Sequence, residues 1–342
     1  MKILIIGSNF HDYTNSLARG FEKNGCEVKI YVPQVYWELT LMGRIHFRMT
    51  TSLRKVCNKR KIVYVKPEPI RRKESQKVFK VYNEFEPDIL VDFASYYLEA
   101  DVLKQMDKCK KIIWIYDSMA RLPHLYEKLK YYDQVYYFEG SDKQFFEEYR
   151  IKATFLPLCA DDKVYYPIEK EKNIDVSFVG NLSYERIQFL LDLKKAFPSS
   201  NFKVYGRIPI LYSLFSSNKK ILKEYSNMFM NCYISPENAN DLYAESKICI
   251  NVHNGQTKYG ANMRFFEIMA AGGFEIVDEN EYITENYKNC VVTYSNMKDL
   301  IEKIQYYMSH SKEREQIAKR GNKVIVMSGL FYHRAKYILD NI

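Results

Sequence analysis

Short apolar segments alternate with amphipathic segments of helical length along most of the chain. The apolar run from Ile3 to Ile6 predicts a first strand, and a helix near 13–24 and a strand at 27–32 follow it. Further strands, each separated from the next by a helix, are expected at 88–93, 111–116, 134–139 and 153–156. This alternation is typical of α/β units on a parallel sheet.

The alternation is interrupted once and then begins again. Residues 161–172 are polar and contain Pro167 and a mixed-charge run, which is typical of a linker. After it we expect helices at 186–195 and 262–271, a helical C-terminal region, and strands at 174–179, 201–205, 247–252, 273–278 and 290–294. The sequence therefore predicts an α/β protein with two Rossmann-like parallel-sheet domains that face a central cleft, where such sheets bind ligands.

The predicted domains span residues 1–165 and 166–325, and residues 326–342 form a C-terminal helix that packs back on the first domain. Hydrophobic residues make up 47% of the chain and charged residues 27%, which describes a globular protein rather than a disordered one. No run approaches the roughly 18 apolar residues of a membrane-spanning helix. The seven cysteines stand singly, without metal-ligand spacing. We expect a cytoplasmic location, in solution or peripheral on the inner face of the membrane.

The net charge of +9 is concentrated in one segment. Residues 41–81 contain thirteen basic residues against Glu68 and Glu74, a local net charge of +11. A concentrated basic field attracts polyanions, and apolar and aromatic residues such as Trp37 and Phe47 lie among the cations. The segment indicates a polyanionic or membrane-associated acceptor, with DNA as one candidate. A solvated lysine-rich surface is the plainer alternative.

The most informative stretch leads from a predicted strand into the helix at 262–271. Asn262 stands at the N-cap position, and Gly272 and Gly273 suit the end of the helix. The free N–H groups at the start of such a helix can bind a diphosphate. Arg264 lies in the first turn and Glu267 three residues on, so both lie on one face. A cation for phosphate beside a carboxylate for sugar hydroxyls suits a nucleotide-sugar site, although an intrahelical ion pair on a surface would also explain the spacing.

The segment around Asn262, Met263, Arg264 and Glu267 resembles the donor-site signature of the CgeB-like (spore maturation protein) glycosyltransferases, which have the GT-B fold. Residues 175–182, 156–167 and 114–118 are similar to other segments of that family, so the resemblance covers about residues 110–330. It implies that Glu267 binds the ribose of the donor nucleotide and Arg264 the diphosphate. Asn262 and Met263 would complete the opening of that helix.

Further donor-site residues follow from the same resemblance. Arg186, after the turn at Gly180 and Asn181, would be a second phosphate ligand. Arg207 and Ile208, after Gly206, would lie near the base. The sequence departs from the large retaining GT-B group, whose motif has two glutamates eight positions apart, because Tyr259 occupies the position eight before Glu267. This departure argues against a retaining mechanism.

A looser resemblance is to the phage DNA β-glucosyltransferases, which have an Arg-x-x-Glu donor helix and a strand-end aspartate followed by Arg-Leu-Pro. Asp117, with Arg121, Leu122 and Pro123, matches the second feature. In those inverting enzymes the aspartate is the base, so Asp117 is the first candidate to deprotonate an acceptor hydroxyl. A helix cap or a structural hydrogen bond is the alternative role.

Two other segments could place side chains in the cleft. His11 and Asp12 follow the first strand and are further catalytic candidates, although Asp12 would also suit the cap of the next helix. His253, at the end of a strand, is expected to contact the donor or its loop. Without a metal site in the sequence, Arg264, Arg186, Lys258 and the helix N-terminus would stabilise the leaving group.

The sequence thus predicts a metal-independent glycosyltransferase. It would transfer a hexosyl group from a nucleoside-diphosphate sugar, UDP-linked for preference, to a hydroxyl of a cell-surface glycan, wall polymer, lipid-linked or protein acceptor, and it would need no cofactor beyond that co-substrate. The alternatives are a DNA glucosyltransferase acting on hydroxymethylated bases and a non-catalytic polyanion-binding protein on the same scaffold.

Overall fold

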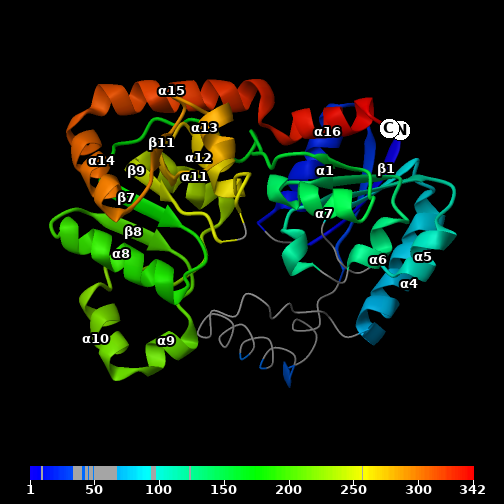
Figure 1. Ribbon diagram of the computed structural model, residues 1–342, viewed down its shortest axis with the longest axis horizontal. Coiled ribbons are helices and arrows are strands. Elements are labelled where there is room, and N and C mark those ends of the chain that lie inside the picture. The colour runs from blue at the N-terminus through cyan, green and yellow to red at the C-terminus, as the bar shows by residue number, and fades with distance from the viewer. Residues whose placement is uncertain are drawn as a thin grey trace.

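The structure is a computed structural model that describes residues 1–8, 11–33, 41–42, 45, 49, 68–93, 98–122, 125–255 and 257–342. Two α/β domains lie beside each other, with both chain termini at the first domain (Figure 1). Within the described residues, every helix is too short or too polar to cross a bilayer.

The first domain is built on a six-stranded parallel sheet with the order β2-β1-β3-β4-β5-β6. Its central strands are continuous apolar runs because helices cover both faces. The strands are β1 (Lys2–Gly7), β2 (Glu27–Tyr31), β3 (Ile89–Phe93), β4 (Lys110–Ile115), β5 (Gln134–Tyr137) and β6 (Ala153–Phe155). The helices are α1 (Tyr13–Lys23), α4 (Glu68–Phe85), α5 (Ala100–Gln105), α6 (Tyr126–Leu129) and α7 (Lys143–Glu148).

The second domain repeats this plan with a five-stranded parallel sheet of order β11-β10-β9-β7-β8. Its strands are β7 (Ile174–Val179), β8 (Phe202–Tyr205), β9 (Ser246–Asn251), β10 (Glu275–Asp278) and β11 (Val292–Tyr294). Its helices are α8 (Tyr184–Ala196), α9 (Ile210–Leu214), α10 (Ser216–Glu224), α11 (Pro236–Glu245), α12 (Met263–Ala270), α13 (Glu281–Asn286), α14 (Met297–Ser309) and α15 (Ser311–Ser328).

The chain crosses between the domains twice. Residues 156–173 lead into the second domain, and after α15 the helix α16 (Phe331–Asp340) returns to the first domain and packs on α1 (Figure 1). A Cβ on Gly20 would stand 2.7 Å from the carbonyl oxygen of Phe331, so glycine permits the close approach of the two helices. The boundaries proposed at residues 165 and 325 stay predictions, and α15 runs through the second of them.

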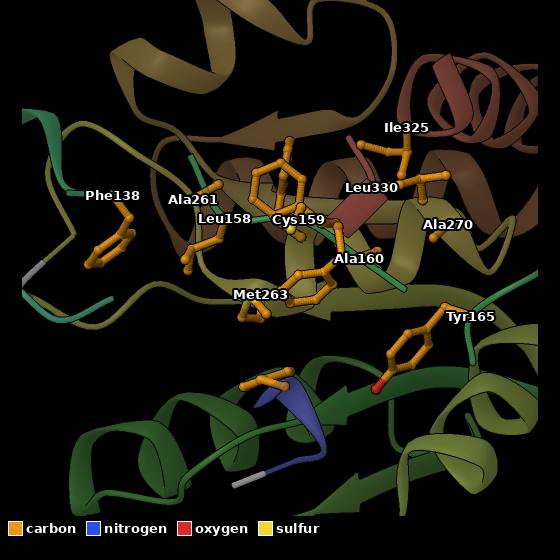
Figure 2. Close-up of a cluster of buried hydrophobic side chains, with 14 of the residues drawn as sticks. Phe138, Leu158, Cys159, Ala160, Tyr165, Ala261, Met263, Ala270, Ile325 and Leu330 are labelled. Carbon is orange, nitrogen blue, oxygen red and sulfur yellow. The ribbon is translucent and has the colours of Figure 1, made fainter. Parts of the chain in front are cut away.

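One apolar core continues across the interface. It joins residues under the first sheet, such as Ile5 and Trp114, to Phe265 and Met269 of α12. Figure 2 shows a part of this cluster, with side chains from the connecting segment, from α12 and from the end of α15 packed together. The burial of these apolar side chains stabilises the contact between the two domains.

The predicted α/β class with two Rossmann-like parallel-sheet domains is confirmed, and the strand and helix bounds named from the sequence agree to within two residues at each end. The sequence did not predict α9, α10 and α11. Most of the basic segment 41–81, including Arg44, Arg48 and the cluster 59–61, lies outside the described residues, as do Trp37, Phe47 and Pro123.

Candidate functional site

The helix α12 begins where the sequence placed it. Asn262 has extended backbone angles, and its side-chain oxygen accepts a 3.1 Å hydrogen bond from the N–H of Phe265. The side-chain amides of Asn262 and Asn251 also bond each other reciprocally, at 3.0 and 2.9 Å. Because Asn251 ends β9, these bonds fix the start of α12 at the carboxyl edge of the second sheet. Met263, next to the cap, is buried.

Arg264 and Glu267 lie together in the interface between the domains. Glu267 is only 1% exposed, and its Oε2 lies 3.6 Å from Nε of Arg264. Tyr13, at the start of α1 in the first domain, donates a 2.9 Å hydrogen bond to Oε1 of Glu267 and accepts a 2.6 Å bond from Nη1 of Arg264. The alternative of a solvent-exposed ion pair does not describe this geometry.

Burial controls the titration of this cluster. It raises the pKa of Glu267, an effect that Arg264 and the hydroxyls of Tyr13 and Tyr165 oppose. Burial would lower the pKa of Arg264, but the oxygen of Tyr13 and the carboxylate of Glu267 outweigh it, so that pKa is raised. Burial also raises the pKa of Tyr13 well above its usual value. Arg264 thus carries its charge inside the interface, where the effect on an anion is strongest.

The catalytic candidates His11 and Asp12 follow β1 and both have left-handed backbone angles, with φ of 50° and 61°. Burial, and then the charge of Arg264, lower the pKa of His11 to about 3. Nε2 of His11 lies 3.4 Å from Nη2 of Arg264. Asp12 stands at the N-cap of α1, but its side chain makes no capping bond and accepts a 2.8 Å bond from Arg19 instead. His11 therefore belongs to the interdomain cluster, and Asp12 forms an ion pair beside it.

Asp117 lies two residues beyond the end of β4, at the carboxyl edge of the first sheet. Its carboxylate accepts a 2.6 Å bond from Nη1 of Arg121, and its side chain is 22% exposed. The neighbouring Tyr116 hydroxyl lies 3.2 Å from Oγ of Ser8, so this edge also adjoins the loop after β1.

His253 is held on three sides by the loops of the second domain. Asp278 accepts a bond from its backbone N–H at 2.7 Å and lies 2.8 Å from its Nδ1. Its Nε2 accepts a 3.1 Å bond from the N–H of Asn262. This pattern requires a neutral ring protonated at Nδ1. His253 therefore braces the start of α12 between β9 and β10.

Arg186 is in the first turn of α8, and its guanidinium bonds the backbone. It donates to the carbonyl oxygens of Asn181 at 2.9 Å and Val252 at 2.6 Å. Nη1 also lies 3.7 Å from the place of a Cβ on Gly180. Burial lowers its pKa. The side chain thus ties the ends of β7 and β9 together at the edge where a phosphate was expected.

The residues expected near the base follow β8. Gly206 has φ of 158°, and a Cβ there would stand 2.1 Å from the carbonyl oxygen of Gly180. The N–H of Ile208 donates to the side chain of Asn231 at 2.8 Å. The exposed Arg207 lies over the ring of Tyr233, 4.8 Å from its centroid. An open groove of about 720 Å³ runs beside them, lined by Tyr205, Tyr233, Asn238, Asp241, Glu245 and Lys203 among others.

Lys258 is exposed, in the loop that leads into α12. Its N–H donates a 3.0 Å bond to Oε2 of Glu139, and the N–H of Tyr259 donates a 2.8 Å bond to Oε1 of the same carboxylate. Gly140 and Gly260 permit this contact, since a Cβ on Gly140 would stand 2.2 Å from the Tyr259 ring and one on Gly260 would stand 2.8 Å from the Phe138 carbonyl oxygen.

The sequence gives no signal for the place of Tyr13, Tyr165 and Glu139 in the site. Its pattern indicates only that Tyr13 starts a helix and that Glu139 ends a strand. Tyr13 lies 254 residues from Glu267 in the chain, and no local pattern links them. Among the described residues, no group of three or more His, Cys, Asp or Glu side chains is placed to hold a metal ion.

Comparison with known proteins agrees with this architecture. Residues 186–340 match the model of a family described as glycosyl transferase-like, and no curated protein matches the sequence. Among solved structures, sucrose-phosphate synthase from Thermosynechococcus elongatus is 11% identical with a TM-score of 0.68, covering 99% of this chain and 98% of its own. An α,α-trehalose-phosphate synthase (UDP-forming) from Burkholderia vietnamiensis is 9% identical with a TM-score of 0.67, at 99% of each chain.

A third structure, Anabaena HepE in complex with UDP-glucose, is 10% identical with a TM-score of 0.63 and full coverage of both chains. These matches confirm the predicted GT-B fold, and the family model over residues 186–340 agrees with the predicted glycosyltransferase class. The finer resemblance to CgeB-like proteins remains a prediction.

Proposed function

We propose that this protein is a glycosyltransferase that transfers a hexosyl group from a UDP-sugar to a hydroxyl of a glycan, wall-polymer, lipid-linked or protein acceptor, without a metal ion. The observation that carries the proposal is the position of Arg264 and Glu267, side by side at the opening of α12 and in the interface between two Rossmann-like domains. A diphosphate would meet a guanidinium and free helix N–H groups there, and a ribose would meet a carboxylate.

The preference for uridine rests on two supports. One relative of the same fold was solved with UDP-glucose and another is described as UDP-forming. The second is the groove along β8 that Tyr205 and Tyr233 line, where the base would find aromatic side chains with polar neighbours. His253 and Arg186 would act by holding the surrounding loops in place, as their bonds to Asp278, Asn181 and Val252 suggest.

Asp117 remains the proposed base, for inversion at the anomeric carbon. It lies two residues beyond the end of β4, at the carboxyl edge of the first sheet, and has partial access to solvent. The 2.6 Å bond from Arg121 would orient the carboxylate toward the acceptor. His11 is a poorer base, because a pKa of about 3 leaves it little tendency to take a proton.

The proposed acceptor is inferred from the basic and exposed apolar side chains of the protein. The described basic residues of the basic segment lie on α4 and include Arg71, Arg72 and Lys73, of which Arg71 pairs with Glu99 at 2.6 Å. On the second domain, α9 and α10 expose Ile210, Leu214 and Phe215 close to Lys219 and Lys223. Exposed apolar side chains beside cations favour an acceptor at an anionic membrane surface over free DNA.

The proposal is tested by calorimetric titration with UDP, UDP-glucose and the corresponding GDP compounds. Wild-type protein should bind a uridine compound saturably, and Glu267→Ala and Arg264→Ala should each weaken binding at least tenfold, since each loses a charge-assisted contact. Lys298→Ala, on the exposed side of α14, is the matched control. Equal binding by wild type and both site variants would exclude this donor site.

The alternatives separate in a second experiment. Asp117→Asn should abolish transfer while leaving UDP binding unchanged. If DNA is the partner, Arg72→Gln with Lys73→Gln should reduce the salt slope of DNA binding by about 0.9 for each phosphate that the variant no longer neutralises. Salt-dependent DNA binding that is accompanied by no donor binding would favour the non-catalytic polyanion-binding protein.

A further inference from the structure

The hydroxyl of Tyr13 makes the contacts that a donor sugar hydroxyl would make. It donates to the Glu267 carboxylate at 2.9 Å and accepts from the Arg264 guanidinium at 2.6 Å. A ribose hydroxyl bound at this carboxylate would also donate to Glu267, and its oxygen would be available to a nearby guanidinium. The phenol therefore stands in for a ligand at the candidate donor site.

The space at Glu267 is too small to hold both the Tyr13 side chain and a ribose. The space beside Glu267 has a volume of about 0 Å³ that a water molecule could occupy, and it is lined by residues of both domains, including His11 and Tyr13 of the first and Pro236 and Glu267 of the second. Ligand pockets usually have about 300–1,000 Å³. Tyr165, from the connecting segment, lies near enough to the same carboxylate to lower its pKa, so Glu267 is enclosed by two phenols and a guanidinium. A ribose can reach Glu267 only after one of these groups has moved.

Tyr13 is the group that domain movement would displace. It is the first residue of α1 in the first domain, whereas Arg264 and Glu267 are both on α12 of the second. His11, two residues earlier, lies against Tyr233 of the second domain, with ring centroids 6.3 Å apart. Separation of the domains would withdraw His11 and Tyr13 together and leave the Arg264–Glu267 pair intact.

We propose that Tyr13 is an internal competitor of the donor: it occupies the hydroxyl site of Glu267 and Arg264 in the unloaded enzyme and is exchanged for the nucleotide ribose when the donor binds. The inference rests on the proposed function of that site. Tyr13 then determines how much of the protein is competent to bind, because donor affinity is reduced by the fraction held in the tyrosine-bound state. It also supplies a hydrogen bond to the buried Glu267 carboxylate when the site is empty.

The test is Tyr13→Phe, which keeps the ring and removes only the hydroxyl. UDP-glucose should bind roughly tenfold more tightly to this variant than to wild type, since the competing bonds to charged groups are removed. The apparent KM for the donor should fall by a similar factor, with little change in kcat. Tyr243→Phe is the control, because Tyr243 is equally buried on α11 and its hydroxyl has no hydrogen-bond partner among the described residues.

The outcomes separate the two claims. Tighter binding by Tyr13→Phe, with Tyr243→Phe unchanged, supports the competitor role. Unchanged or weaker binding by Tyr13→Phe, in a wild type that binds UDP-glucose, overturns this inference alone and makes Tyr13 a donor contact or a structural residue. If no nucleotide binds to wild type or to either variant, the proposed donor site and the competitor role are both wrong. Thermal denaturation of all three proteins checks that each is folded.

Discussion

The N–H of Tyr259 donates a 2.8 Å hydrogen bond to Oε1 of Glu139, which places a carboxylate of the first domain under the loop that leads into α12. The same carboxylate accepts from the N–H of Lys258 and from the hydroxyl of Ser141, and it is fully buried. The start of α12 is therefore positioned from both domains. Asn251 and His253 hold it from the second domain, and Glu139 holds it from the first.

Replacement of Glu139 by Gln should loosen this loop. One side-chain atom would become an N–H₂ group facing a backbone N–H, so two donors would oppose each other in a buried site. We expect a loss of about 1–3 kcal/mol in the free energy of unfolding, measured by chemical denaturation. Donor affinity should fall as well, because the loop carries Lys258.

Glu285→Gln is the matched control for that change. Glu285 accepts a 2.7 Å bond from the hydroxyl of the same Tyr259, but at an exposed position. It should alter the free energy of unfolding by less than about 0.5 kcal/mol. Equal effects of the two substitutions would contradict a positioning role for Glu139.

Substitution of Arg186 distinguishes a residue that binds phosphate directly from one that only holds two loops in place. Its guanidinium bonds the carbonyl oxygens of Asn181 and Val252, so Arg186→Ala should leave both without that donor. The free energy of unfolding should fall by about 2 kcal/mol even when no nucleotide is present. Arg207→Ala, at an exposed arginine of the same edge, should leave stability unchanged. A variant of Arg186 that is as stable as wild type but binds donor weakly would favour the direct phosphate role instead.

Local signals predicted the elements, whereas the contacts that build the site were not predictable. Asn262 and the glycines after Ala271 marked the ends of α12, because caps and terminators act within a few residues. The placement of Tyr13 on Glu267 and of Glu139 under Tyr259 depends on how two domains dock, which no pattern in either segment records. Asp12 shows the same limit. Aspartate is a common N-cap residue, but Asp12 has a left-handed backbone and its side chain bonds Arg19 instead of capping α1.

Short or surface helices were also missed for a physical reason. None of the residues of α10 is buried, so it lacks the apolar stripe by which a helix is usually detected. The helix α9 has only five residues. Central strands such as β1 and β3, in contrast, are almost wholly buried apolar runs, and their pattern is unambiguous.

We expect Glu275→Gln to change how the stability of the protein depends on pH. It is buried on β10, and burial raises its pKa well above the usual value. In the unfolded chain the carboxyl ionises above its ordinary pKa, while in the folded protein it keeps its proton. Its contribution to stability is therefore complete below about pH 4.5 and declines as the pH rises toward the folded pKa.

Glu275→Gln removes this decline, because an amide does not titrate and can still accept the 2.9 Å bond from Asn251. The variant should gain stability relative to wild type as the pH rises from 4.5 to 7. Denaturation curves at several pH values measure it. A difference in stability that stays constant between pH 4.5 and pH 7 would contradict a raised pKa for this carboxyl.

His11 should make the free energy of unfolding depend on pH in the direction opposite to Glu275. Burial and the charge of Arg264 lower its pKa to about 3, whereas in the unfolded chain it titrates near 6.5. Between these two values the unfolded chain binds a proton and the folded protein does not, so stability falls as the pH is lowered through that window. The slope from this one group is at most about 1.4 kcal/mol per pH unit.

His11→Gln should remove that slope, since glutamine cannot take the proton that drives unfolding. The free energy of unfolding of wild type minus that of the variant should decrease steadily from pH 6.5 to pH 4. His310→Gln, at a solvent-exposed histidine between α14 and α15, should leave the slope of wild type in place. A slope that is unchanged in His11→Gln would mean that the ring is hydrated and protonates in the folded protein, and Arg264 would then face a second cation across the interface.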